Sequence, residues 1–193
     1  ISIWLHLSIC INYALRFFRN TYLFNFNMMN FPILSSLILL PSIGALFILF
    51  IKSSSSNKYQ ASKYVALFTS FANFLISIYL WYLFDNSTYD FQFVEDKQWL
   101  KGFVNYKVGI DGISILFILL TTLITPLCII SVNNSITSRL KEFLIAILIM
   151  ESFMIGVFCS LDLVIFYLFF EGGLIPMFLI IGIWGGSRRV YSA

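Results

Sequence analysis

Two carboxylates interrupt apolar stretches of this sequence. Glu151 and Glu171 each lie inside a long run of apolar residues, and no lysine, arginine or histidine occurs between Glu142 and Ser187. A charged side chain at the centre of a bilayer costs about 2.5 to 3.5 kcal/mol, so an ionisable group placed there is a functional candidate. In such surroundings a carboxyl group can hold and release a proton, or bind a cation in transit.

The spacing of the two glutamates places them at one depth. Glu151 precedes Asp162 by eleven residues and Glu171 follows it by nine. If Asp162 caps the turn between two helices, a rise of about 1.5 Å per residue puts the carboxyl groups roughly 16 and 14 Å from that turn. The alternative is a neutral acid that only holds helices together through hydrogen bonds. Two acids at the same depth favour a functional role, with Glu171 as the primary candidate and Glu151 as the secondary one.

The backbone beside Glu171 is expected to be irregular. Pro176 removes a helix hydrogen bond to the carbonyl of Gly172, and Gly173 is a second small residue in the same turn. Small residues also let water or another helix approach closely. We therefore expect a kink near Gly172, Gly173 and Pro176.

The composition is that of an integral membrane protein. Of the 193 residues, 60% are hydrophobic and 11% are charged, whereas a soluble domain carries roughly 25% charged residues. A soluble fold is excluded on this ground. The net charge of +3 is small and dispersed, so nucleic acid is not expected as a partner. The three cysteines lack a CxxC spacing and indicate neither a metal site nor a disulfide framework.

Five apolar runs are long enough to cross a hydrocarbon core of about 30 Å. The sequence therefore predicts an all-α membrane protein with about five transmembrane helices in a transmembrane region that covers residues 31–189. The spans are expected near residues 31–51, 64–84, 113–132, 143–160 and 163–184. Pro126 is tolerated in the third span, because transmembrane helices can satisfy the carbonyl that proline frees. Asp111 is expected to cap the start of that span.

Polar segments separate these spans. The tract from Ser53 to Lys58 should form a flexible connection outside the lipid, and the hydrophilic segment from Asp85 to Gly112 should lie on the membrane surface. Residues 1–30 are predicted to form an interfacial helix, with an additional span as the alternative. Residues 190–193 form a short C-terminal tail.

Basic residues gather on one side of the predicted membrane region, which indicates the inner side. They are Lys52, Lys58 and Lys63 after the first span, Arg139 and Lys141 after the third, and Arg188 and Arg189 after the fifth. In a mitochondrion this side would be the matrix.

Two long motifs point to a family. VGIDGISILFILLTT at 108–122 and FCSLDLVIFYLFFEGGLIPMFLIIGIWGG at 158–186 resemble the chain 4 family of mitochondrial NADH:ubiquinone oxidoreductase, respiratory complex I. The motifs DNSTYDFQFVEDKQWL and LILLPSIGALFILF are similar to earlier parts of the same subunits. The resemblance covers about residues 31–189, and the FFE followed by LIP is specific.

The resemblance implies an antiporter-like subunit of the membrane arm, of which this chain would form the first third, and which moves protons across the mitochondrial inner membrane as a multi-pass protein. By resemblance, Glu171 matches the essential glutamate of the family's fifth helix, which works against a lysine on the seventh. Glu151 matches a glutamate that plant-type members carry on the fourth helix. NADH, FMN, iron–sulfur clusters and quinone are expected in other subunits, because this sequence has neither a glycine-rich dinucleotide turn nor a cysteine cluster.

The resemblance also implies partners. The family's seventh helix lies beyond the last span found here, so we expect a second polypeptide to supply the remaining helices and the lysine partner of Glu171. A longer chain, of which this is one segment, is the alternative. Other membrane-arm subunits and lipids complete the expected surroundings. Two other functions stay open: a fragment of a multisubunit cation/proton antiporter, and a purely structural membrane subunit.

Overall fold

A computed structural model describes residues 32–51, 56–100, 104–132 and 139–185. The chain divides into two units at Pro32, and all of the described helices and strands belong to the second unit. The predicted interfacial helix at 1–30, the tail at 190–193, and the basic residues Lys52, Arg188 and Arg189 lie outside the described residues.

Five helices make up most of the second unit. They are α2 (Ile33–Phe50), α3 (Ser56–Leu83), α4 (Ser114–Ser131), α5 (Leu140–Cys159) and α6 (Leu163–Trp184). In the described part of the chain, all five are long and apolar enough to cross a membrane, which confirms the predicted all-α membrane fold.

One boundary differs clearly from the prediction. α3 begins at Ser56, so Asn57 and Lys58 are helical and do not belong to the polar connection. The part of α3 that is apolar enough to span begins only at Gln60. The first turn of α3 therefore lies outside the apolar part of the helix.

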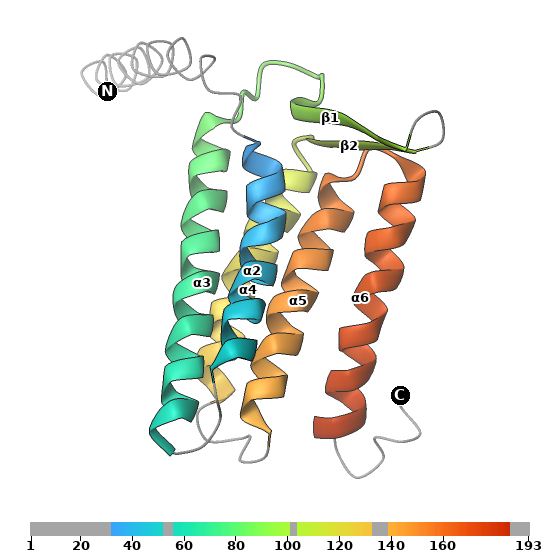
Figure 1. Ribbon diagram of the computed structural model, residues 1–193. Coiled ribbons are helices and arrows are strands. Elements are labelled where there is room, and N and C mark those ends of the chain that lie inside the picture. Colours follow the sequence, from blue (N-terminus) through green and yellow to red (C-terminus); the bar gives the residue numbers. More distant parts are fainter. Residues whose placement is uncertain (1–31, 52–55, 101–103, 133–138, 186–193) are drawn as a thin grey trace, which may run out of the picture. The chain divides into compact units, whose positions relative to one another are not determined.

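α5 is the central helix of the unit and packs against the other four helices (Figure 1). Buried apolar side chains of α5 contribute to two clusters. The cluster near the strands includes Leu37, Ile118 and Ile155, and the cluster at the far end includes Ile48 and Leu148. α6 packs chiefly on α5. This arrangement leaves much of α6 facing outward.

The surface segment contains a hairpin that sequence analysis did not assign. β1 (Gln92–Leu100) pairs antiparallel with β2 (Val104–Ile110), and the two strands lie across one end of the helices (Figure 1). The backbone N–H of Leu161 donates to the carbonyl of Lys107 at 3.0 Å. The hairpin is therefore attached to the short turn between α5 and α6. Its run Glu95, Asp96, Lys97 is poor in strand-forming residues, so local preference does not reveal the strand.

The hairpin also holds the start of α2. One carboxylate oxygen of Glu95 accepts the backbone N–H groups of Leu34, at 2.8 Å, and Ser35, at 3.3 Å. The Ser35 hydroxyl donates to the other carboxylate oxygen and lies 3.0 Å from the Tyr106 hydroxyl. Burial raises the pKa of Tyr106, so this phenol stays neutral beside the carboxylate. A negative group at a helix N-terminus matches the helix dipole.

The opposite end of α2 is held by a cation. The Lys141 ammonium, in the first turn of α5, donates to the carbonyl oxygens of Leu49 at 2.9 Å and Ile51 at 2.8 Å. These carbonyls have no partner further along α2, because the helix ends at Phe50. α2 is thus bound at each end by a side chain of the complementary charge.

Two aspartates bind the starts of helices; the predicted cap at Asp162 is confirmed, whereas Asp111 does not occupy the predicted N-cap position. Asp162 is the N-cap of α6, and its carboxylate accepts the backbone N–H of Val164 at 2.8 Å. The Asp111 carboxylate accepts the backbone N–H of Ser114 at 2.7 Å, although Ile113 occupies the N-cap position of α4. The hydrogen bonds from Ser114 lower the pKa of Asp111. Neither aspartate needs a catalytic explanation.

Candidate functional site

The two membrane glutamates lie at one depth but in different surroundings. Glu151 is eight residues before the end of α5 at Cys159, and Glu171 is eight residues after the start of α6 at Leu163. Each is therefore about 12 Å from the helix end that adjoins the turn between α5 and α6. Glu151 is buried, with 2% of its surface exposed, whereas Glu171 is exposed. The structure thus gives two separate sites.

Glu151 has an amide partner on α3. The side-chain nitrogen Nδ2 of Asn73 donates to Glu151 Oε1 at 2.9 Å, and both side chains are buried. The other two polar atoms of the pair, Glu151 Oε2 and Asn73 Oδ1, are buried without a hydrogen-bond partner among the described residues. Two of the four polar atoms of the pair are thus hydrogen-bonded within the described part of the chain.

Sequence analysis missed Asn73, although its pattern was visible. Small and polar residues follow one stripe of α3, and all of them are buried: Ser62, Ala66, Ser70, Asn73 and Ser77. The spacing of four, four, three and four residues marks one helix face. An amide within such a stripe is costly in a membrane unless another polar group meets it.

Hydroxyl groups join the helices near this pair. Ser152, next to Glu151, donates to the carbonyl of Ile38 at 2.5 Å and accepts from Ser42 at 2.8 Å. One turn from Asn73, the hydroxyls of Ser77 and Thr122 lie 2.7 Å apart. The bundle interior around Glu151 is therefore polar along several helix contacts.

Glu171 lies on the outward face of α6. The Tyr167 hydroxyl, one turn earlier, donates to its carboxylate, and Tyr167 is itself exposed. In the membrane-spanning stretch of α6, 11% is buried inside the structure, whereas in that of α5 the buried share is 56%. This face is open to whatever packs against α6 in the membrane.

No cation stands at the depth of either glutamate within the spanning helices. α2, α4 and α6 contain no lysine, arginine or histidine. The basic residues of the other two helices are Lys58 and Lys63 near the start of α3 and Lys141 in the first turn of α5.

The small residues after Glu171 allow α5 and α6 to approach each other. A Cβ at Gly172 would lie 2.8 Å from Cε1 of Phe153, closer than a side chain tolerates, and one at Gly173 would lie 3.6 Å from Phe153 Cβ. Pro176 is buried at the same contact. α6 nevertheless runs as one unbroken helix from Leu163 to Trp184, so the expected irregularity does not interrupt it.

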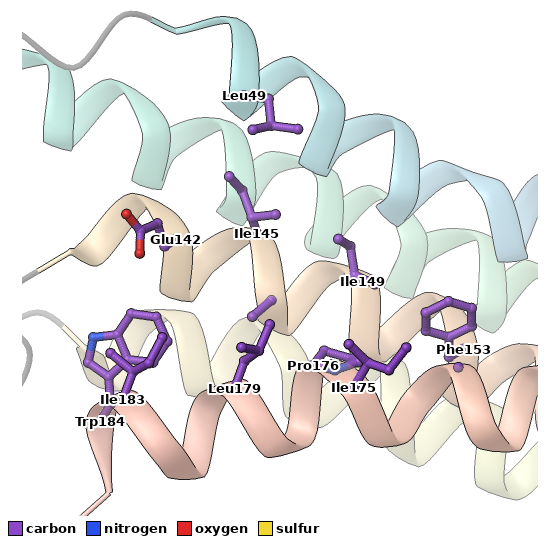
Figure 2. Close-up of a pocket in the computed structure, with 12 residues that line it drawn as sticks. Leu49, Glu142, Ile145, Ile149, Phe153, Ile175, Pro176, Leu179, Ile183 and Trp184 are labelled. Atoms are coloured by element: carbon purple, nitrogen blue, oxygen red, sulfur yellow. The ribbon is translucent and has the colours of Figure 1, made fainter.

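An apolar groove of about 420 Å³ follows this contact. Figure 2 shows side chains of α5, such as Ile149, and of α6, such as Leu179, facing one another along it. Its lining residues are Leu49, Glu142, Ile145, Ala146, Ile149, Phe153, Gly172, Ile175, Pro176, Leu179, Ile183 and Trp184. Neither Glu171 nor Glu151 belongs to that lining.

The described residues contain no cluster of three or more histidine, cysteine, aspartate or glutamate side chains that could hold a metal ion.

Comparison with known proteins finds homologues over most of the chain. It is 50% identical over 161 residues to NADH-ubiquinone oxidoreductase chain 4 of Marchantia polymorpha, and 47% identical over 161 residues to that of Arabidopsis thaliana; each match covers 83% of this chain and 32% of the relative. It is 55% identical over 132 residues to NADH-quinone oxidoreductase subunit M of Rhodobacter capsulatus, which covers 68% of this chain and 25% of the relative. No family model matches the chain. The chain thus spans about a third or less of the length of these relatives.

Proposed function

With homology to chain 4 and subunit M of NADH–quinone oxidoreductases as the premise, we propose that the chain is part of a proton-translocating subunit in the membrane arm of respiratory complex I. The location we propose is the mitochondrial inner membrane, because two of the relatives are plant chain 4 proteins. The observation that carries the proposal is Glu171, an exposed acid at mid-membrane depth on the least covered spanning helix.

The proposed mechanism uses the electrostatics of Glu171. Removal from water disfavours a carboxylate, while a nearby ammonium favours it. An ammonium that moves by a few ångströms can therefore make the carboxyl group take up or release a proton. Tyr167 would orient the carboxylate through its hydroxyl. The electron-transfer energy that drives the motion must come from elsewhere in the complex.

The open face of α6 is where we place the partner. Exposed apolar side chains flank Glu171 on this helix, among them Ile175 and Phe178, and a bare carboxylate among them would be costly in lipid. We propose that helices outside this sequence cover the face and bring a lysine to Glu171. NADH, FMN, iron–sulfur clusters and quinone would be held by other subunits of the complex, and lipids would cover the remaining apolar faces.

Substitution of Glu171 tests the proposal. Glu171→Gln in the complex reconstituted into liposomes should abolish or sharply reduce proton uptake per NADH oxidised, because a neutral amide cannot carry the proton. Glu142→Gln, which removes an exposed acid in the first turn of α5, is the matched control and should leave pumping unchanged. Glu151→Gln should have a smaller effect than Glu171→Gln.

Three outcomes would overturn parts of the proposal. Unchanged pumping in Glu171→Gln would indicate a purely structural subunit. An equal or larger loss in Glu151→Gln would mean that Glu151 is the main translocating acid. Purification of the assembled protein without any NADH-oxidising subunits would indicate a cation/proton antiporter instead.

A further inference from the structure

We infer that Glu151 and Asn73 form a buried proton-binding site, in which Glu151 is a neutral carboxylic acid joined to the Asn73 amide by two hydrogen bonds. The site lies between α5 and α3 and is separate from the outward-facing Glu171. It does not depend on proton translocation by Glu171.

Two polar atoms of the pair have no partner among the described residues. Asn73 Nδ2 donates to Glu151 Oε1 at 2.9 Å, which leaves Glu151 Oε2 and Asn73 Oδ1 buried and unpaired among the described residues. If Glu151 were ionised, both of these atoms would be acceptors, and neither could satisfy the other. A buried polar atom without a partner costs about 1 to 3 kcal/mol.

One proton on the carboxyl group gives both of these atoms a hydrogen-bond partner. A hydrogen on Glu151 Oε2 turns that atom into a donor, and Asn73 Oδ1, on the same amide that already contacts the carboxyl group, is the available acceptor. A carboxylic acid and a primary amide each present one donor and one acceptor on one edge. The pair then has both of its edges satisfied with no other group involved.

A charge on Glu151 would lack compensation. Lys63 on α3 lies ten residues before Asn73, and Lys141 on α5 lies ten residues before Glu151, so each backbone position is about 15 Å away along the helix. Lys141 already donates to the carbonyls of Leu49 and Ile51 at the end of α2. α2, α4 and α6 contribute no basic residue.

The other titratable side chains described on α5 and on the elements packed against it do not supply the missing donor, because Oε2 of Glu151 has no hydrogen-bond partner among the described residues. These side chains are Tyr64, Tyr79 and Tyr82 on α3, Cys128 on α4, Glu142 and Cys159 on α5, Tyr167 and Glu171 on α6, and Tyr106 and Lys107 on β2.

The chemistry of the site selects a proton over a metal cation. The pair offers two unpaired oxygen atoms, which is what one shared proton needs. Hard cations take many more oxygen ligands, six to eight for Ca²⁺, and no such cluster occurs among the described residues.

The protonation state can be read directly by carbon-13 NMR of the full chain in lipid bilayers. The sequence contains four glutamates, Glu95, Glu142, Glu151 and Glu171, so glutamate labelled at Cδ gives four carboxyl signals, and Glu151→Gln identifies one of them. At pH 7, where an exposed glutamate is ionised, the Glu151 signal should be that of a carboxylic acid. A carboxylate signal at pH 7 would overturn the inference.

Substitution of Asn73 tests the pairing. Asn73→Leu should shift the Glu151 signal, because the acid loses its amide partner. Ser70→Ala is the matched control, since Ser70 lies one turn away on the same stripe and its hydroxyl donates within its own helix, to Leu67. An unshifted signal in Asn73→Leu, or an equal shift in Ser70→Ala, would overturn the pairing.

If Asn73→Leu does not fold, thermal unfolding of Glu151→Gln provides a second test. Glu151→Gln preserves a donor and an acceptor facing Asn73, so its melting temperature should lie within a few degrees of the wild type. A collapse of the fold in Glu151→Gln would contradict a neutral pair. Glu171→Gln should leave the Glu151 signal unchanged, so failure here and failure of the translocation proposal are told apart.

Discussion

A single carboxylate determines how α2 starts. Glu95 accepts two backbone N–H groups and the Ser35 hydroxyl at that helix end, and each of these donors would otherwise need water or another acceptor. Hydrogen bonds to an ionised group are roughly twice as strong as neutral ones. The contact also joins the surface hairpin to the membrane-spanning part, which makes Glu95 a residue with two structural roles.

Glu95→Gln should therefore lower the free energy of unfolding by about 1 kcal/mol, since an amide oxygen is a weaker acceptor and carries no charge to match the helix dipole. Thermal unfolding in detergent measures the change. Asp96→Asn, at the next and exposed position of the same strand, is the control and should have little effect. Equal effects of the two substitutions would show that the cap contributes nothing.

Asp111 gives the fold a pH dependence at the start of α4. Hydrogen bonds from Ser114 lower the pKa of Asp111 in the folded state, so the carboxylate stabilises the fold above the unfolded-state pKa, near 3.9, and this contribution is lost as the pH falls through the lower folded value. Because Asp111 is partly exposed, the effect is a few tenths of a kcal/mol. Unfolding followed from pH 7 to acid should show a smaller loss in Asp111→Asn than in the wild type or in Asp90→Asn, and identical curves would contradict this.

At the scale of elements, close approach of α5 and α6 depends on glycines of both helices. A Cβ at Gly156 would lie 2.7 Å from Cγ of Phe169, near the fixed root of that ring, whereas a Cβ at Gly172 would meet the far edge of the Phe153 ring, at 2.8 Å. The outer edge of a ring moves more easily than its root. The Gly156 contact is therefore the stricter of the two.

Gly156→Ala should destabilise the chain by about 1 to 3 kcal/mol through overpacking, and Gly172→Ala should destabilise it less. Gly182→Ala is the control on α6, because a Cβ there meets nothing within 4 Å, and it should be neutral or slightly stabilising. Thermal unfolding of the three variants in detergent measures the order of their stabilities. A loss in Gly182→Ala as large as that in Gly156→Ala would show that helix backbone effects, not packing, decide these positions.

At the scale of the whole molecule, the five spans followed from length and hydropathy, because uncharged runs of about 20 residues have few other stable states. The cap at Asp162 followed from a local rule of helix starts. The hairpin and the partner of Glu151 did not follow, since both depend on which distant segments meet. Asn73 and Glu151 are 78 residues apart, and only the packing of α3 on α5 joins them.

Charge on the described helix ends predicts the orientation. Lys63 lies near the start of α3 and Lys141 in the first turn of α5. Both helices start at the end of the bundle away from the hairpin (Figure 1), and basic residues favour the inner side. In mitochondrial inner membranes a membrane-impermeant maleimide added from the intermembrane side should label Tyr89→Cys, in the fully exposed segment before β1. It should not label Arg139→Cys until the membrane is opened. The reverse pattern would invert the topology.

The binding of α2 at both ends limits how this region can move. Glu95 and Lys141 bind the two ends of α2 from different elements. Movement of α2 along the membrane normal would therefore break one of these contacts, or would also move the hairpin and the start of α5. α2 is therefore held in place along the membrane normal. α6 packs chiefly on α5, so it is the less constrained of the two helices.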